Sequence, residues 1–161
     1  MNISFILNGE DVEVETQGDN RLANILRHSF KLLGTKTDCY IGNCGVCSVL
    51  LNGDVVKSCL VPAFMIRESE VITIEGFSQT EEYQDIIAGF SEAGIETCRF
   101  CNTGKILATE ALLSRDMLPS KEKILAAFQG IKCRCVEPEE LVRGIVKVSE
   151  QRRRRLYGRS R

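Results

Sequence analysis

The chain has 161 residues, of which 43% are hydrophobic and 27% charged, and its formal net charge is −1. This composition is typical of a soluble globular protein with one domain or two small ones. No apolar run approaches the roughly 18 residues of a membrane span, and the N-terminus is too polar for a signal peptide, so we expect a cytoplasmic protein with no membrane span.

The N-terminal segment predicts a β-hairpin followed by a helix. Apolar residues alternate over residues 3–7, and Asn8-Gly9 predicts a tight turn into a second strand. Asp19 or Asn20 is expected to cap a helix. One face of this helix would carry Leu22, Ile25, Leu26 and Phe30.

A second hairpin is predicted where Asn52-Gly53 separates a strand over residues 46–51 from one that contains Val55 and Val56. A last short strand would contain Val71, Thr73 and Ile74. Hairpin, helix, hairpin and strand together predict a small α+β unit with a helix laid across a mixed sheet.

The second half of the chain predicts helices. Apolar residues recur at helical spacing over residues 107–112, 125–128 and 141–148. Pro138, which has no N–H to lose, is followed by two acidic residues, and this combination is typical of a helix start.

Residues 76–78 are the predicted boundary, which gives domains at 1–76 and 77–150 and a basic tail at 151–161. The charge is about +6 from Lys147 onward and about −7 over the remaining chain. The tail arginines are Arg152 to Arg155, Arg159 and Arg161. No aromatic-rich or groove-reading motif accompanies them, so we expect a solvated helix end or a subunit-docking tail and no nucleic-acid partner.

Eight cysteines fall into two sets of four. The first set, spaced C-x4-C-x2-C-x11-C, is Cys39, Cys44, Cys47 and Cys59. The second set, spaced C-x2-C-x31-C-x-C, is Cys98, Cys101, Cys133 and Cys135. In a reducing cytosol, such clusters indicate metal or redox chemistry, and four thiolates suit either a structural zinc or a [2Fe–2S] cluster.

The spacing of the first quartet favours [2Fe–2S] over zinc, disulfides or free thiols. Its C-x4-C-x2-C loop has plant-type ferredoxin spacing, whereas zinc sites usually pair two short knuckles. Such a loop must wrap around the cluster and direct backbone N–H groups at the sulfurs. Gly42 and Gly45 would supply the positive φ and close approach that this wrapping requires, and Cys59 would add the fourth ligand after the hairpin.

The second quartet is ambiguous by itself. Cys98 and Cys101 would share one side of a helix start, and Cys133 and Cys135 point the same way only in an extended segment. The 31 residues between the pairs allow two antiparallel helices, which would place the site at one end of a small bundle. Both zinc and [2Fe–2S] remain open for these residues.

Four motifs in order, "CYIGNCGVCSVLLNG", "SCL", "CRFCNTGKILAT" and "IKCRC", resemble the iron–sulfur subunit of molybdenum hydroxylases over residues 3–148. That family includes xanthine dehydrogenase, aldehyde oxidoreductase and carbon monoxide dehydrogenase. The resemblance implies an α+β protein: a plant-type ferredoxin (β-grasp) domain followed by a small all-α helical bundle domain, each with one [2Fe–2S] cluster.

The resemblance also implies partners. Thr97 and Cys135 would lie beside the molybdopterin of a large subunit, and the ferredoxin domain would pass electrons to a subunit that carries FAD or to another acceptor. The chain would be an electron-transfer subunit of an oxidoreductase, without catalytic residues towards an organic substrate. A free-standing two-cluster carrier and a zinc-stabilised interaction module are the alternatives.

Several residues depart from the family pattern. Thr97 stands where many relatives have Gln, and Asp38 stands where Gly is common. Arg99 and Asn102-Thr103 depart from the C-G-[FY]-C-T-P-G motif of relatives. After the last cysteine, Val136-Glu137-Pro138 takes the place of Thr-Gly-Tyr. All eight cysteines are retained, so a divergent branch is indicated. We interpret His28, the only histidine, as an ordinary surface or boundary residue. Lys36 and Arg99, beside the cysteine loops, are interpreted as solvated charges, with tuning of the cluster potentials or partner binding as the alternative.

Overall fold

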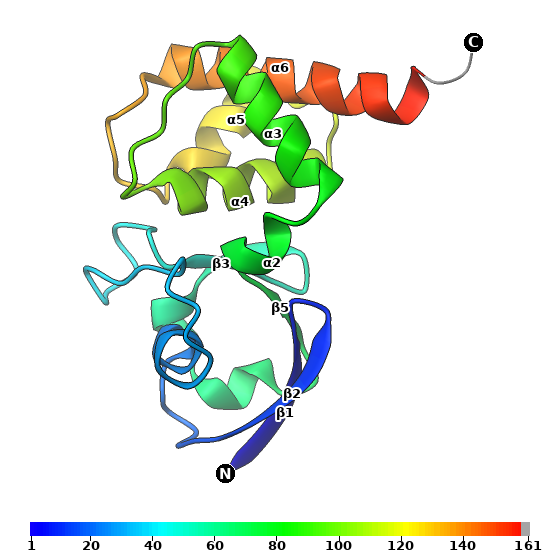
Figure 1. The fold of residues 1–161 in the computed structure, drawn as a ribbon. Helices are drawn as coiled ribbons and strands as arrows, with labels where there is room; N and C mark the ends of the chain where they lie inside the picture. Colours follow the sequence, from blue (N-terminus) through cyan, green and yellow to red (C-terminus); the bar gives the residue numbers. More distant parts are fainter. Residues whose placement is uncertain (159–161) are drawn as a thin grey trace.

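The N-terminal half of this computed structural model, which describes residues 1–158, folds as a mixed five-stranded sheet (Figure 1). The strands are β1 (Asn2–Leu7), β2 (Glu10–Glu15), β3 (Ser48–Leu51), β4 (Asp54–Lys57) and β5 (Glu70–Ile72). Their order is β2-β1-β5-β3-β4, with β1 parallel to β5 and the other neighbours antiparallel. The predicted mixed sheet and both Asn-Gly hairpins are confirmed.

A short helix packs on this sheet, as predicted, but its start differs. It comprises α1 (Leu22–Asn24) and a π-helical turn, η1 (Ile25–Ser29), and three of the predicted apolar residues are buried: Leu22, Ile25 and Leu26. Capping by Asp19 or Asn20 is wrong, because Arg21 occupies the cap position without a side-chain bond. The Asn20 side chain instead donates to Thr16 Oγ1 at 3.0 Å.

Two strand ends also differ from the prediction. β3 begins at Ser48 because residues 46–47 still belong to the turn of the cysteine loop. β5 ends at Ile72, so placing Thr73 and Ile74 in a strand is wrong. The Thr73 N–H donates to Asn8 Oδ1 at 2.8 Å, and the chain turns there into α2 (Ile74–Phe77).

Two short 3₁₀ helices complete the sheet unit: η2 (Ser58–Leu60) and η3 (Ala63–Ile66). The helical unit follows, with α3 (Glu81–Glu92), α4 (Asn102–Leu113), α5 (Lys121–Phe128) and α6 (Pro138–Tyr157). The predicted α+β fold is therefore confirmed. The sequence prediction missed α3, although Thr80 accepts a capping hydrogen bond from the Tyr83 N–H at 3.2 Å.

Each unit has its own hydrophobic core. Ile3, Leu22 and Leu26 are among the fully buried residues beneath the sheet, and Ile86 and Leu107 are buried among the helices. Leu50 of β3 packs into the helical core, and Figure 1 shows α4 lying over the sheet at β3. The two units therefore share an apolar interface.

Helix α6 extends through Tyr157, into the segment predicted to be a basic tail. Arg152 is only 4% exposed, and its guanidinium lies 2.6 Å from Glu110 Oε2 and 3.4 Å from Asp85 Oδ2. Arg155 also pairs with Asp85, at 2.8 Å. A solvated helix end is thus wrong for these two arginines, which bind α6 to α3 and α4.

The neighbouring arginines behave as the sequence predicts. Arg153 and Arg154 are exposed, as is His28. Arg159 and Arg161 lie outside the described residues. None of the helices within residues 1–158 combines the length and the apolar character needed to cross a membrane.

Candidate metal centres

The first cysteine loop, residues 39–47, is shaped by left-handed backbone conformations at Tyr40, Gly42 and Gly45, with φ of 54°, 72° and 78°. A Cβ atom at Gly42 would clash with the Leu60 side chain. One at Gly45 would clash with the carbonyl oxygen of Gly130, which is backbone and cannot move aside easily. Glycine at position 45 is therefore needed both for its φ and for the contact with the helical unit.

Backbone N–H groups of this loop point at a sulfur. The N–H groups of Asn43 and Cys44 both donate to Cys39 Sγ at 3.3 Å. The Cys44 N–H, followed by the backbone of Ile41, lowers the pKa of Cys39 to about 6. The loop thus stabilises negative charge on its first sulfur, as wrapping around an anionic group requires.

The other two cysteines of the first quartet are buried together. Cys47 and Cys59 are each 2% exposed and pack against Ala23. The hydroxyl of Ser58, in η2, donates to the Cys47 carbonyl at 2.7 Å and fixes this approach. Burial raises the pKa of Cys47 to about 11. The first quartet therefore forms two pairs, Cys39 with Cys44 and Cys47 with Cys59, and its sulfurs are not among the ligand groups found within 4.8 Å of one another in residues 1–158.

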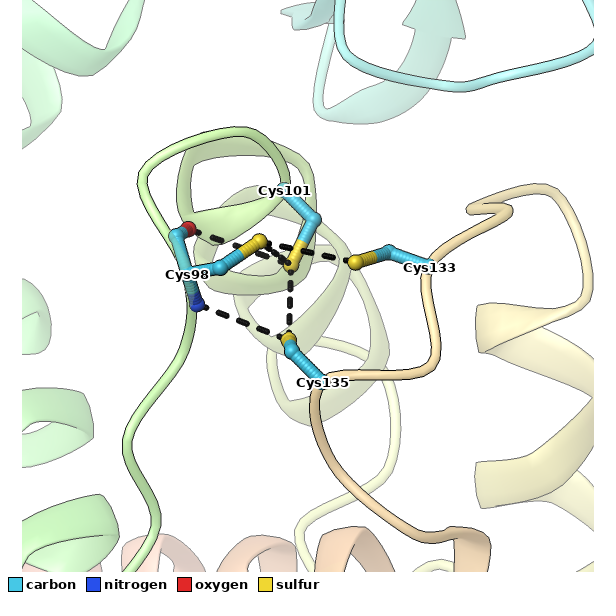
Figure 2. Close-up of side chains that lie close together, drawn as sticks. All are labelled: Cys98, Cys101, Cys133 and Cys135. Atoms are coloured by element: carbon cyan, nitrogen blue, oxygen red, sulfur yellow. Dashed lines mark hydrogen bonds between the residues drawn. The ribbon is translucent and has the colours of Figure 1, made fainter.

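The second quartet lies at one end of the helical unit, where the spacing predicted it. Cys98 and Cys101 precede α4, and Cys133 and Cys135 lie on the segment between α5 and α6. Figure 2 shows the four side chains pointing toward one another. Within residues 1–158 this is the one group of potential metal-ligating side chains found with all its ligand atoms within 4.8 Å.

Sulfur–sulfur distances within the second quartet are short. They are 3.4 Å for Cys98–Cys101 and for Cys98–Cys133, and 3.2 Å for Cys101–Cys135. The Cys98 N–H also lies 3.5 Å from Cys135 Sγ (Figure 2). Such convergence of four thiols without a disulfide is what a bound metal group requires.

Burial differs across the second quartet. Cys101 is fully buried, Cys98 and Cys133 are half-buried, and Cys135 is exposed. Burial raises the pKa of the Cys101 thiol above its usual range. At Cys135, desolvation acts to raise the pKa, but the Cys98 N–H and the neighbouring Cys101 and Lys105 outweigh it and lower the pKa to about 6.

Lys105 is a site residue that the sequence prediction missed. Its ammonium lies 3.2 Å from Cys135 Sγ and 3.4 Å from Cys101 Sγ, and the residue is 3% exposed. Burial acts to lower the pKa of Lys105, but the two sulfurs raise it overall. The i, i+4 spacing from Cys101 along a helix start was the available sequence signal.

The two cysteine sites are joined by hydrogen bonds between the units. The Lys132 N–H, next to Cys133, donates to the carbonyl of Cys44 at 3.0 Å. Lys36 Nζ donates to Asn102 Oδ1 at 3.2 Å, so this lysine is not merely a surface residue. These contacts hold the first loop against the loop of the second quartet.

The departures from the family pattern have structural consequences at this end of the bundle. Val136 is buried, and Glu137 caps α6 in a reciprocal capping box with Glu140. Thr97 is half-buried beside Cys98, and Arg99 is exposed. The unusual Val136-Glu137-Pro138 therefore forms a helix start directly after Cys135.

The donor sets fit iron–sulfur clusters. Four thiolates accept either zinc or a [2Fe–2S] group, but a loop that presents three cysteines in C-x4-C-x2-C spacing and aims N–H groups at a sulfur is typical of the dinuclear group. A β-sheet unit with such a loop, joined to a four-cysteine helical unit, defines an iron–sulfur electron-transfer protein.

Comparison with known proteins agrees with this class. Residues 5–73 match the family described as "2Fe-2S iron-sulfur cluster binding domain", and residues 73–146 match the "[2Fe-2S] binding domain" family. The chain is 38% identical to the nicotinate dehydrogenase small FeS subunit of Eubacterium barkeri, over 83% of this chain and 85% of that protein.

Two further relatives support the same conclusion. The isoquinoline 1-oxidoreductase subunit alpha of Brevundimonas diminuta is 37% identical, over 83% of this chain and 88% of that protein. The crystal structure of quinoline 2-oxidoreductase from Pseudomonas putida 86 superposes with a TM-score of 0.83 at 31% identity, covering 95% of this chain and 96% of that one. The chain belongs to the family of small iron–sulfur subunits of the molybdenum hydroxylases, and it is an electron-transfer subunit of an oxidoreductase.

Proposed function

We propose that the chain carries electrons between a molybdopterin centre on a large partner subunit and a flavin or other acceptor. Two [2Fe–2S] clusters would be held within domains 1–76 and 77–150, the first by Cys39, Cys44, Cys47 and Cys59 and the second by Cys98, Cys101, Cys133 and Cys135. The observation that carries this proposal is the convergence of the second quartet, with the first cysteine loop held against it by the bond from Lys132 to Cys44. When bound, such clusters supply one-electron transfer.

The chain's own residues support this role in three ways. The N–H groups of Asn43 and Cys44 stabilise negative charge at the first site. Burial of Cys47, Cys59 and Cys101 limits the access of water. The inter-unit hydrogen bonds keep the separation of the two sites constant, which efficient electron transfer requires.

The exposed side chains at the two sites support the assignment of each site to a different partner subunit. Cys135 is exposed, and Phe100, between Cys98 and Cys101 in the sequence, is 41% exposed, so we assign this end of the bundle, including Thr97, to the molybdopterin subunit. Ile41 is 74% exposed on the first loop, and we assign that face to a subunit that carries FAD or to another acceptor. The substrate would be selected by the large subunit.

The proposed location is the cytoplasm, and residues 151–161 would form the basic end of the chain. The eight cysteines form two quartets and no disulfide in the described residues, a use of cysteine that is typical of a reducing compartment. The partner proposed for this chain is thus a cytoplasmic molybdenum-containing subunit.

Purification from the native cell tests this function. A tagged chain is expected to bring down a large molybdopterin-containing subunit. Phe100→Glu should weaken that association, whereas Leu118→Glu, at a 66% exposed position after the far end of α4, should not. Recovery of the chain alone with both clusters would contradict the subunit role and favour a free-standing carrier. Recovery with stoichiometric zinc and no iron would favour an interaction module.

A further inference from the structure

Lys105 is a buried cation whose only side-chain partners within residues 1–158 are sulfurs. Its ammonium donates to Cys135 Sγ at 3.2 Å and to Cys101 Sγ at 3.4 Å. It forms no ion pair with a carboxylate of the described residues. At 3% exposure, the side chain has lost nearly all its contact with water.

This position is unfavourable for a cation unless negative charge lies next to it. Burying an ammonium without a counter-charge is costly. Lys105 also lies in the first turn of α4, near the positive end of the helix dipole, which adds to the cost. The sulfurs of Cys101 and Cys135, at 3.4 and 3.2 Å from the ammonium, are the groups placed to offset the cost of burial and the unfavourable helix dipole.

We propose that Lys105 raises the reduction potential of the cluster held by the second quartet, by keeping a positive charge against the sulfurs of Cys101 and Cys135. This inference rests on the proposed function. Reduction adds one electron to the site and no bond is formed or broken, while the ammonium keeps its proton. A fixed neighbouring cation stabilises the more negative, reduced state more than the oxidised state.

Other cations close to the second quartet in sequence are exposed. Arg99, Lys132 and Arg134 all face solvent, where water and salt screen their charge. Arg134 lies between Cys133 and Cys135 in sequence, so it offers a matched control with the same charge change. The effect should therefore be specific to Lys105 rather than to any nearby cation.

The test is a redox titration of the full chain, followed by electron paramagnetic resonance. In Lys105→Gln, the equilibrium constant for reducing the second cluster should fall tenfold or more, which corresponds to about 59 mV for one electron. The first cluster should be unaffected. Lys105→Arg should stay close to the unaltered chain, and Arg134→Gln should shift much less. An unchanged potential in Lys105→Gln, or an equal shift in Arg134→Gln, would overturn the proposal.

If Lys105→Gln binds no second cluster, a second measurement tests the contact between Lys105 and that cluster in the unaltered chain. The unaltered chain is produced with lysine labelled with ¹⁵N only at Nζ, and pulsed electron paramagnetic resonance is recorded on the second signal. We expect a coupling between the ¹⁵N nucleus and the second cluster in the unaltered chain, and its disappearance in Lys105→Arg. If the unaltered chain shows no such coupling, the contact is refuted. Failure of the unaltered chain to show any second iron–sulfur signal would instead contradict the proposed function.

Discussion

The sheet unit and the helical unit hold their cysteines by different physical means. Within residues 1–158, nine of ten residues with positive φ lie before residue 69, and Gly94 is the exception. Conversely, every ion pair described except Arg115–Asp54 lies within the helical unit. The first site is thus shaped by backbone conformation, whereas the second lies in a unit whose helices are joined by ion pairs and has one buried cation, Lys105, against its sulfurs.

Because of this difference, the two units should tolerate different changes. A loop that depends on glycine φ values and N–H donors is sensitive to an added Cβ but little affected by pH or salt. A bundle that depends on buried charge pairs responds strongly when one partner is removed, because the other is left uncompensated. Away from the interface between the units, substitutions in one unit should therefore leave the other largely intact.

The largest effect is expected from the cysteines themselves. Cys44→Ser should remove the ferredoxin-type paramagnetic signal and leave the other signal, and Cys101→Ser should do the reverse. Iron analysis and electron paramagnetic resonance of the reduced variants measure this. If either variant lost both signals, the two sites would not be independent, and if neither signal were lost, the assignment of ligands would be wrong.

Arg152 offers the strongest test of charge in the helical unit. Arg152→Met leaves Glu110 without its buried partner, while Asp85 keeps its pair with Arg155, so we expect a loss of about 3 kcal/mol in the free energy of unfolding. Denaturation by urea, followed by circular dichroism, measures it. The exposed Arg153→Met is the matched control, and an equal loss there would show that the burial of Arg152 is irrelevant.

Gly45 tests the backbone-built site. Gly45→Ala adds the strain of a positive φ and a clash with the Gly130 carbonyl, so we expect a loss of about 2 kcal/mol or more in the free energy of unfolding. Gly53→Ala, with similar φ and no atom within 4 Å of the added Cβ, should lose only about 1 kcal/mol. Equal losses, measured by the same denaturation, would exclude the contact between the units as the cause.

The smallest effect concerns pH. Burial acts to raise the pKa of Glu82, but its helix-start hydrogen bond and Arg155 lower it below 4.5 overall. A carboxyl with a lowered pKa adds stability above pH 4.5, and this contribution is lost as the pH falls through the folded-state value. Glu82→Gln should therefore lower the free energy of unfolding at pH 7 by at most about 1 kcal/mol, because solvent screens this partly exposed carboxylate. Well below the folded-state pKa of Glu82, the substitution should have no effect on stability. A pH-independent cost would contradict this account.

Much of the architecture can be predicted because its signals are local. Both Asn-Gly hairpins, the helix start at Pro138 and the convergence of Cys98 with Cys135 all follow from spacing over short segments or from simple helix geometry. The fold class follows in turn, since period-two strands precede period-3.6 helices along the chain.

What escaped prediction depends on contacts between distant residues. In the sequence, Arg152 belongs to a run of arginines that predicts a solvated segment. Its partners Asp85 and Glu110 lie 67 and 42 residues away along the chain. The end of β5 depends on the Asn8 side chain, 65 residues from Thr73. Lys105 was missed because helical spacing does not reveal that its face would be covered by Cys135.

The most direct test of the central claim is the metal content of the unaltered chain, combined with paramagnetic resonance after reduction. We predict about four irons and four acid-labile sulfides per chain, with two distinct signals from two [2Fe–2S] clusters. Stoichiometric zinc without iron, or iron for only one cluster in fully loaded protein, would contradict it.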